Sequence, residues 1–181
     1  MKLVILDRDG VINFDSAQFI KSPAEWKPIP GSLEAIARLT QSGYRVVVAT
    51  NQSGIGRGLF DMDVLNSIHE KMHKAVVGLG GRIDAVFFCP HTSDSKCSCR
   101  KPLPGMFKRI AETLNVGLKG VHTVGDSLRD LQAGAAIGCK TNLVLTGKGE
   151  KTQAEGNLPE ATRVFPDLAA FVQDLLKKQA L

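Results

Sequence analysis

The feature that most restricts the fold is an alternation of short apolar runs with longer amphipathic segments. Five runs rich in Val, Ile, Leu and Phe show little polar alternation, as expected for strands buried on both faces. These runs are Leu3–Leu6, Arg45–Ala49, Ala85–Phe88, Val121–Val124 and Leu143–Leu145, with an edge strand expected near Arg163–Phe165. Helices are expected at Ser32–Ser42, Asp61–Val77, Gly105–Leu114, Leu128–Ile137 and Asp167–Lys178. Such alternation predicts an α/β fold with a doubly wound, mostly parallel sheet.

Length and charge narrow the class of protein. The 181 residues are enough for one domain, so residues 1–181 are expected to form a single one. No apolar run approaches the ~20 residues that span a bilayer, and Leu3–Leu6 is too short for a signal peptide. We therefore expect a cytoplasmic monomer without a membrane partner. The net charge of +5 fits a small anionic substrate, whereas 6% aromatic residues and the lack of a Lys/Arg block argue against nucleic acid.

Polar motifs follow four of the predicted strands, and two of the connections are long loops, Phe14–Pro30 and Cys89–Pro104. The motifs are Asp7-Arg8-Asp9-Gly10, Thr50-Asn51-Gln52-Ser53-Gly54, Arg100-Lys101-Pro102 and Gly125-Asp126-Ser127 with Asp130. Ligands bind outside the carboxyl ends of strands in open α/β sheets, so the fold would gather all four motifs at one edge. Loops as long as these two are usually functional.

Three carboxylates are expected to meet at this edge. Asp7 and Asp9 share a face of an extended segment, and Asp126 arrives from a neighbouring strand. Two like charges ~4 Å apart cost about 4 kcal/mol at an effective dielectric near ~20, and a divalent cation removes that cost. The ligands are hard oxygens, which favours Mg²⁺.

The second and third motifs supply groups that can hold a phosphate. Thr50 and Asn51 offer a hydroxyl, an amide and backbone N–H groups, and Lys101 offers a full charge. Each motif alone is more often a structural turn or cap. Their occurrence in this order at successive strand ends favours a phosphate site.

In these motifs the chain resembles the haloacid dehalogenase (HAD) superfamily of phosphotransferases over nearly its whole length. The resemblance implies that Asp7 is the nucleophile and that Asp9 protonates the leaving oxygen and then activates water. It also implies that Thr50 and Lys101 stabilise the phosphoryl group, and that Mg²⁺ is bound by Asp7, the backbone carbonyl of Asp9, and Asp126. Because a free aspartate is mostly ionised at pH 7, Asp9 is expected to sit where its neutral form is favoured at the moment when it protonates the leaving oxygen.

Within the superfamily the chain most resembles the D-glycero-D-manno-heptose-1,7-bisphosphate 7-phosphatase group, which implies a core without a large cap domain and a role in lipopolysaccharide biosynthesis. The pointers are the segments 50–58, 89–91 and 97–102. The substrate-binding residues expected on this basis are Asp15, Gln18, Asn51, Gln52, Ser53, Arg57 and Arg100. One departure is Ser127, where some heptose members carry Lys, so a phosphate or sugar contact made by that Lys would be missing.

The loop 89–104 contains a candidate metal site. Cys89, His91, Cys97 and Cys99 form two pairs spaced i, i+2. Three thiolates and one imidazole match a closed, structural Cys₃His zinc site, and the family resemblance supports it. The alternative is reduced cysteines in a surface loop. Zinc here would place Arg100 and Lys101, the next two residues, over the site.

Other chemistry-bearing residues have simpler interpretations. His69 and His73 lie i, i+4 on a predicted helix and are expected on its solvated face. Trp26 and Cys139 are expected to pack in the interior. Lys148, after the fifth strand, is a candidate for substrate contact.

The main hypothesis is therefore a Mg²⁺-dependent phosphomonoester hydrolase, with histidinol phosphate as the alternative substrate. Two non-enzyme hypotheses are a zinc-dependent nucleic-acid-binding module and an inactive HAD-like binding protein. The first lacks a basic aromatic surface, and the presence of both Asp7 and Asp9 argues against the second.

Overall fold

The computed structural model describes residues 2–178 and contains one six-stranded sheet with the order β3-β2-β1-β4-β5-β6. All neighbouring strands are parallel, which confirms the predicted doubly wound sheet. The strands are β1 (Leu3–Leu6), β2 (Arg45–Asn51), β3 (Ala85–Cys89), β4 (His122–Gly125), β5 (Lys140–Val144) and β6 (Arg163–Phe165). β5 begins earlier than predicted because the buried polar residue Asn142 belongs to it, where its side-chain amide donates to the backbone carbonyls of Thr123 and Lys140.

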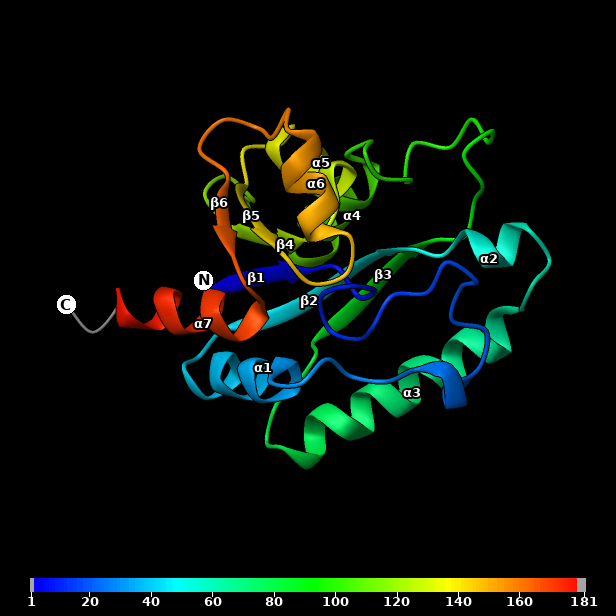
Figure 1. Ribbon diagram of the computed structural model, residues 1–181, viewed down its shortest axis with the longest axis horizontal. Coiled ribbons are helices and arrows are strands. Elements are labelled where there is room, and N and C mark those ends of the chain that lie inside the picture. Colours follow the sequence, from blue (N-terminus) through cyan, green and yellow to red (C-terminus); the bar gives the residue numbers. More distant parts are fainter. Residues whose placement is uncertain (1, 179–181) are drawn as a thin grey trace.

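Two apolar cores lie on opposite faces of the sheet. Helices α1 (Ser32–Gln41), α3 (Met62–Gly78) and α7 (Leu168–Lys177) cover one face, and α4 (Gly105–Leu114) and α5 (Leu128–Ala135) cover the other (Figure 1). In β1, Val4 and Leu6 enter the first core, whereas Leu3 and Ile5 enter the second. Strands buried on both faces need apolar side chains at every position, which explains the uninterrupted runs in the sequence.

The sequence did not predict three short helices. They are a 3₁₀ helix, η1 (Pro23–Glu25), the single turn α2 (Ser53–Gly56) and α6 (Gly149–Glu155). Of α6, only Gly149 and Thr152 are buried, so no apolar period marks it. η1 and α2 are too short for their sequences to show the apolar periodicity of a helix.

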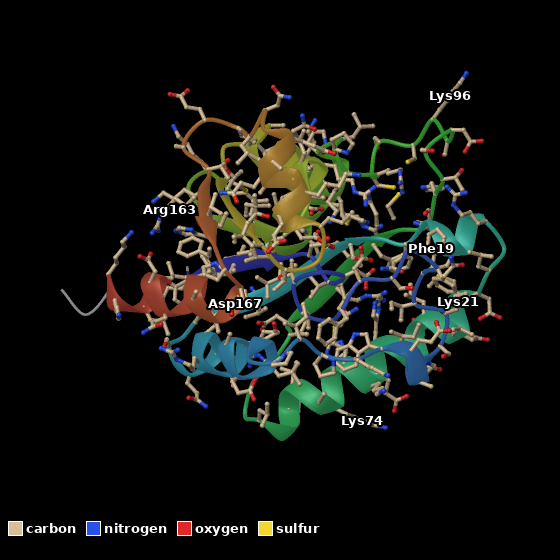
Figure 2. The ribbon with its side chains drawn as sticks, in the orientation of Figure 1. Phe19, Lys21, Lys74, Lys96, Arg163 and Asp167 are labelled. Atoms are coloured by element: carbon tan, nitrogen blue, oxygen red, sulfur yellow. The ribbon has the colours of Figure 1, made fainter. Side chains whose placement is uncertain are left out.

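The chain changes direction between β1 and β4. It runs outward from β1 through β2 to β3 and then returns to β4 on the other side of β1. The carboxyl ends of β1 and β4 are therefore a topological switch point, where α/β sheets bind ligands. The long loops after β1 and β3, marked by Phe19 and Lys96 in Figure 2, lie at this end of the sheet.

These two loops carry no separate domain. Between residues 7 and 31, and between 90 and 104, η1 is the only helix, so no large cap covers the edge within residues 2–178. No helix among the described residues is both long and apolar enough to cross a membrane.

Candidate active site

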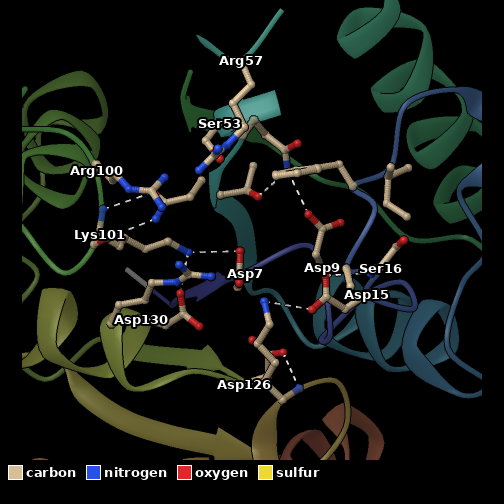
Figure 3. Close-up of a pocket in the computed structure, with 18 residues that line it drawn as sticks. Asp7, Asp9, Asp15, Ser16, Ser53, Arg57, Arg100, Lys101, Asp126 and Asp130 are labelled. Carbon is tan, nitrogen blue, oxygen red and sulfur yellow. Dashed lines mark hydrogen bonds and ion pairs between the residues drawn. The ribbon is translucent and has the colours of Figure 1, made fainter. Parts of the chain in front are cut away.

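A cavity of about 260 Å³ opens at the carboxyl ends of β1, β2 and β4 (Figure 3). Most of the site residues predicted from the sequence line it, and they come from all four motifs. The lining residues are Asp7, Asp9, Asp15, Ser16, Ala17, Phe19, Ile20, Thr50, Asn51, Gln52, Ser53, Arg57, Arg100, Lys101, Asp126, Arg129, Asp130 and Lys148. Gln18 is not among them, and its side chain is exposed.

Asp7 is held in place on one side of its carboxylate. Its Oδ1 accepts from the backbone N–H of Arg8 at 2.8 Å and lies 3.0 Å from Lys101 Nζ. Within the described part of the chain, Oδ2 has no hydrogen-bond partner. A fixed carboxylate with one free oxygen is suited to nucleophilic attack.

Lys101 is a buried cation shared by two carboxylates. Its Nζ lies 3.0 Å from Asp7 Oδ1 and 2.7 Å from Asp130 Oδ1, and it donates to the Ala49 carbonyl at 2.7 Å. Burial alone would lower the pKa of Lys101, but the carboxylates of Asp130 and Asp7 raise it, so the side chain stays charged. Its three N–H bonds all have acceptors, which fixes the ammonium group beside the nucleophile.

The acidic groups form a cluster that can hold a divalent cation. Asp7, Asp126 and Asp130 each offer an oxygen within 4.8 Å of the others. Burial and the neighbouring carboxylates raise the pKa of Asp7 to about 7 and that of Asp126 to about 8. Such crowding of hard oxygen ligands fits Mg²⁺, which would relieve the repulsion. Asp130 contacts Lys101 and caps the start of α5, so Asp7 and Asp126 are the better candidates for metal-binding side chains.

Ser127 and Asp130 cap helix α5 and join it to the site. The backbone N–H and the hydroxyl of Ser127 both donate to Asp130 Oδ2, at 3.0 and 2.7 Å. Ser127 is buried and is committed to this capping box. Its role is therefore to orient Asp130, which in turn holds Lys101.

Asp9 lies in surroundings that stabilise its carboxylate form. Its Oδ1 accepts from Arg8 Nε at 2.9 Å and Asn13 Nδ2 at 2.9 Å, and its Oδ2 accepts from Arg8 Nη2 at 3.1 Å and Gln52 Nε2 at 3.0 Å. Burial alone would raise the pKa of Asp9, but the Arg8 guanidinium and these hydrogen bonds lower it. These surroundings favour the ionised form of Asp9 through a buried cation that was not foreseen, and the neutral form expected at the moment of leaving-group protonation stays a prediction.

The motif after β2 forms hydrogen bonds with the motifs that follow β1 and β3. Gln52 Nε2 donates to Thr50 Oγ1 at 2.9 Å as well as to Asp9. Asn51 forms a reciprocal pair with the backbone of Lys101, both bonds being 3.1 Å long. The end of β2 therefore fixes the backbone that carries Lys101.

Three arginines make part of the cavity wall, here called the basic wall, strongly basic. The side chains of Arg57, Arg100 and Arg129 reach it from three different segments, and none of them forms an ion pair with a carboxylate in residues 2–178. Burial and the nearby Arg129 lower the pKa of Arg100. Sequence reasoning missed Arg129, although it stands two residues after Ser127 on the first turn of α5.

The candidate Lys148 also reaches this cavity. Its Nζ lies 3.0 Å from Asp15 Oδ2, and its backbone N–H donates to Asp126 Oδ2 at 2.8 Å. Lys148 therefore connects the loop after β1 to the acidic cluster.

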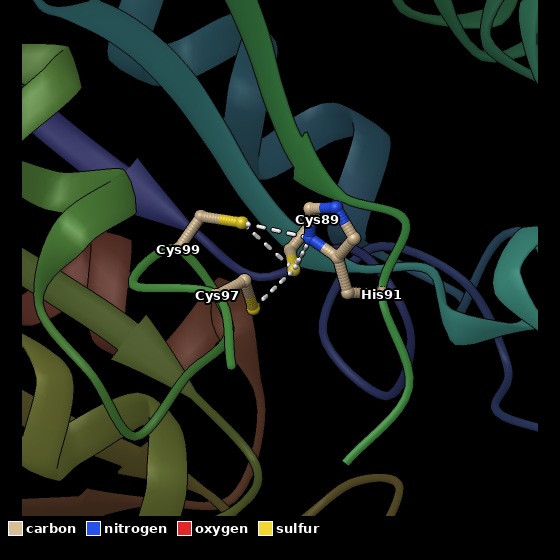
Figure 4. A group of neighbouring side chains, drawn as sticks. All are labelled: Cys89, His91, Cys97 and Cys99. Atoms are coloured by element: carbon tan, nitrogen blue, oxygen red, sulfur yellow. Dashed lines mark hydrogen bonds between the residues drawn. The ribbon is translucent and has the colours of Figure 1, made fainter. Parts of the chain in front are cut away.

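The four residues Cys89, His91, Cys97 and Cys99 converge on one point (Figure 4). Sγ of Cys89 lies 3.8 Å from Sγ of Cys97 and 3.0 Å from that of Cys99, and His91 Nδ1 lies 3.4 Å from Cys89 Sγ and 3.3 Å from Cys99 Sγ. Thiolates about 2.3 Å from a tetrahedral zinc ion would be roughly 3.8 Å apart, so the cluster needs little adjustment to hold one. Burial raises the pKa of Cys89 to about 12, so a cation is needed to keep this sulfur ionised.

Three residues outside the motifs were also assigned from the sequence. Trp26 and Cys139 are buried, as expected. The prediction for His69 is wrong, because this residue is buried and its Nε2 lies 3.1 Å from Arg8 Nη1. Its helix packs that side against the end of β1, where the buried arginine lies.

Comparison with known proteins agrees with this geometry. A family profile described as HAD-hydrolase-like matches residues 98–171. The D-glycero-beta-D-manno-heptose-1,7-bisphosphate 7-phosphatase of Bordetella bronchiseptica is 61% identical over 178 residues, which are 98% of this chain and 99% of that protein. The protein of the same name from Pseudomonas putida is 51% identical over 97% of this chain and 100% of its own. A crystal structure of D,D-heptose 1,7-bisphosphate phosphatase from B. bronchiseptica, complexed with magnesium and phosphate, has a TM-score of 0.97 at 61% identity and covers 98% of this chain and 99% of that one.

The fold, the site and these matches define the chain as a HAD-like phosphatase, as its motifs predicted. Within that class it belongs to the family of D-glycero-β-D-manno-heptose-1,7-bisphosphate 7-phosphatases.

Gly10 provides a test of the acidic cluster. A Cβ at this position would lie 2.0 Å from Asp126 Oδ2, and the residue has a φ of +82°. Gly10→Ala should therefore displace Asp126 and lower phosphatase activity by about 100-fold or more. Gly43→Ala is a matched control, because Gly43 has a φ of +79° and nothing within 4 Å of a Cβ. The control should lose about 1–2 kcal/mol of stability and keep its activity. Steady-state kinetics and thermal unfolding of both variants would measure this, and native activity in Gly10→Ala would contradict the role given to Asp126.

Proposed function

We propose that this phosphatase removes the 7-phosphate of D-glycero-β-D-manno-heptose 1,7-bisphosphate through an aspartyl-phosphate intermediate. The observation that carries the proposal is Asp7, with one oxygen fixed by Lys101 and Arg8 and the other facing the cavity. The names of the relatives supply the identity of the sugar.

The reaction has two steps that use the same residues. A carboxylate oxygen of Asp7 attacks phosphorus, the bond between phosphorus and the sugar oxygen breaks, and Asp9 gives that oxygen its proton. Asp9 then takes a proton from water as the water attacks the aspartyl phosphate, which releases inorganic phosphate and restores Asp7. An arriving phosphate dianion would repel the Asp9 carboxylate and so favour the protonated form that the first step requires.

The remaining groups balance charge during phosphoryl transfer. Asp7, Asp126 and the backbone carbonyl of Asp9 would hold Mg²⁺, which supplies positive charge beside the phosphate oxygens. Thr50 is placed to donate its hydroxyl proton to a phosphate oxygen. The ammonium group of Lys101, 3.0 Å from Asp7, offsets negative charge at the nucleophile.

The basic wall supports a substrate with a second phosphate. Arg57, Arg100 and Arg129 line the cavity that Asp7 also lines, and guanidinium groups bind phosphate through two parallel hydrogen bonds. An uncharged sugar terminus would leave these cations without an anionic partner. This arrangement favours a bisphosphate over histidinol phosphate.

The following experiment tests the proposed function. The native chain should have a higher kcat/KM for the heptose bisphosphate than for histidinol phosphate. Asp7→Asn should lose at least about 10⁴-fold in kcat on both, because an amide is a poor nucleophile. Phosphate release measured with Mg²⁺ present would check both points. A preference for histidinol phosphate would overturn the substrate, and an active Asp7→Asn would overturn the nucleophile.

The second phosphate predicts a selective effect at Arg129. Removing one charge-assisted hydrogen bond worth about 1.5–3 kcal/mol should lower kcat/KM of Arg129→Ala for the bisphosphate by about tenfold or more. The 7-monophosphate of the same sugar lacks that contact and should be affected much less. Arg109→Ala, which removes an exposed arginine outside the cavity, controls for net charge. Equal losses on both substrates would argue against a second-phosphate contact.

We also infer that the Cys/His cluster binds a structural zinc ion that positions the segment from Cys99 to Lys101. The convergence of three sulfurs and one ring nitrogen supports this. Cys99→Ser should lose zinc, measured by elemental mass spectrometry, and should lower activity because Lys101 follows two residues later. Cys139→Ser, a buried cysteine outside the cluster, should keep its zinc. Loss of zinc with unchanged kinetics would show that the cluster does not position the site.

Three broader features complete the proposal. We infer that residues 1–181 form one domain, that the protein acts as a monomer, and that it works in the cytoplasm. All the residues that the proposed reaction uses lie on this chain, so the reaction needs no residue from a partner. The zinc-binding thiolates require a reducing compartment, which supports the location.

A further inference from the structure

The buried pair Arg8 and His69 is not explained by the reaction as described above. Arg8 has a side-chain exposure of zero, although it stands between two carboxylates of the active site. Its guanidinium group extends from the end of β1 to helix α3, where Nη1 lies 3.1 Å from His69 Nε2. Burying a charged side chain is costly unless it is paired, so its contacts are informative.

The contact with Arg8 fixes the protonation state of His69. A guanidinium group has donors only, so His69 Nε2 must accept the hydrogen bond. The ring is then neutral and carries its proton on Nδ1. His69 therefore acts as an acceptor that holds one end of the Arg8 fork.

The other end of the fork holds Asp9. Arg8 Nε and Nη2 bind the two oxygens of Asp9 at 2.9 and 3.1 Å, which is a bidentate contact. A bidentate contact fixes the plane of a carboxylate as well as its position. Asn13 and Gln52 add one donor to each oxygen, so four protein donors decide where Asp9 points.

We propose that Arg8, held by His69, is a positioning residue that orients the Asp9 carboxylate toward the leaving oxygen of the substrate. This rests on the proposed function, in which Asp9 transfers the proton. Arg8 is turned away from the cavity and acts through Asp9. The contacts thus run from His69 on α3 through Arg8 to Asp9, which transfers the proton.

The consequence is a dependence on the leaving group. A sugar alkoxide needs a proton as its bond to phosphorus breaks, whereas 4-nitrophenolate leaves without one. A poorly oriented Asp9 should therefore slow hydrolysis of the heptose bisphosphate more than that of 4-nitrophenyl phosphate. A purely structural role for Arg8 and His69 would lower both rates alike.

The test compares His69→Leu with His69→Gln. His69→Leu removes the acceptor and should lower kcat on the heptose bisphosphate by about 10- to 100-fold, a fraction of the usual effect of general acid catalysis. The loss on 4-nitrophenyl phosphate should be at least several-fold smaller, and KM should change little. His69→Gln keeps an acceptor oxygen and should restore much of the rate. His73→Leu, one turn further along α3, is the control and should behave as the native chain.

Arg8→Lys provides a second variant if His69→Leu does not fold. It keeps the charge but cannot form the fork, so it should show the same dependence on the leaving group. Equal losses on the two substrates, or no loss in His69→Leu, would overturn the proposal. If the native chain hydrolysed neither substrate, the proposed function would fail instead, so the two failures are distinguishable.

Discussion

The site depends on the ion pairs that Lys101 forms with Asp7 and Asp130. Carboxylates from β1, from the end of β4 and from α5 meet in a buried place, and without a buried cation their repulsion would push the three segments apart. Lys101 offsets this repulsion at one oxygen of Asp7 and leaves the other oxygen free for chemistry. Asp126, which has a backbone hydrogen bond but no cationic side chain beside it in the described residues, is then available for a metal ion.

The position of Lys101 in turn depends on the end of β2 and on the loop that precedes Lys101. Asn51, at the end of β2, holds its backbone through a reciprocal pair of hydrogen bonds. The Cys/His cluster ends at Cys99, two residues before it. The loop after β3 therefore links a candidate zinc site to the nucleophile. This explains why so long a polar loop is present in a chain without a large cap.

Much of the fold could be predicted because buried parallel strands appear in the sequence as uninterrupted apolar runs. The runs that contain Leu3–Leu6 and Ala85–Phe88 became strands because all of their side chains except that of Phe88 enter one of the two cores. Most site residues could also be placed, since the carboxyl ends of parallel strands meet at one edge. Helix α6 could not, because it is polar and packs through few residues. Gln18 was named as a substrate residue on resemblance alone, and its side chain lies outside the cavity.

The sequence by itself determined which chemical groups are candidates for the site: Asp7 and Asp9, Thr50, Lys101 and Asp126, which line the cavity, and the four Cys and His side chains that converge in the loop after β3. Local patterns suffice for this because each motif follows its own strand. Only the tertiary structure decided how those groups are oriented and how their pKa values are shifted. Arg8 is charged and next to Asp7, yet burial turns it toward Asp9 and His69. His69 lies on α3, 61 positions further along the chain, and was expected on a solvated face. Its Nε2 nevertheless accepts a hydrogen bond from that arginine. Contacts between segments so far apart leave no local signal, because they depend on which faces the sheet and α3 present to each other.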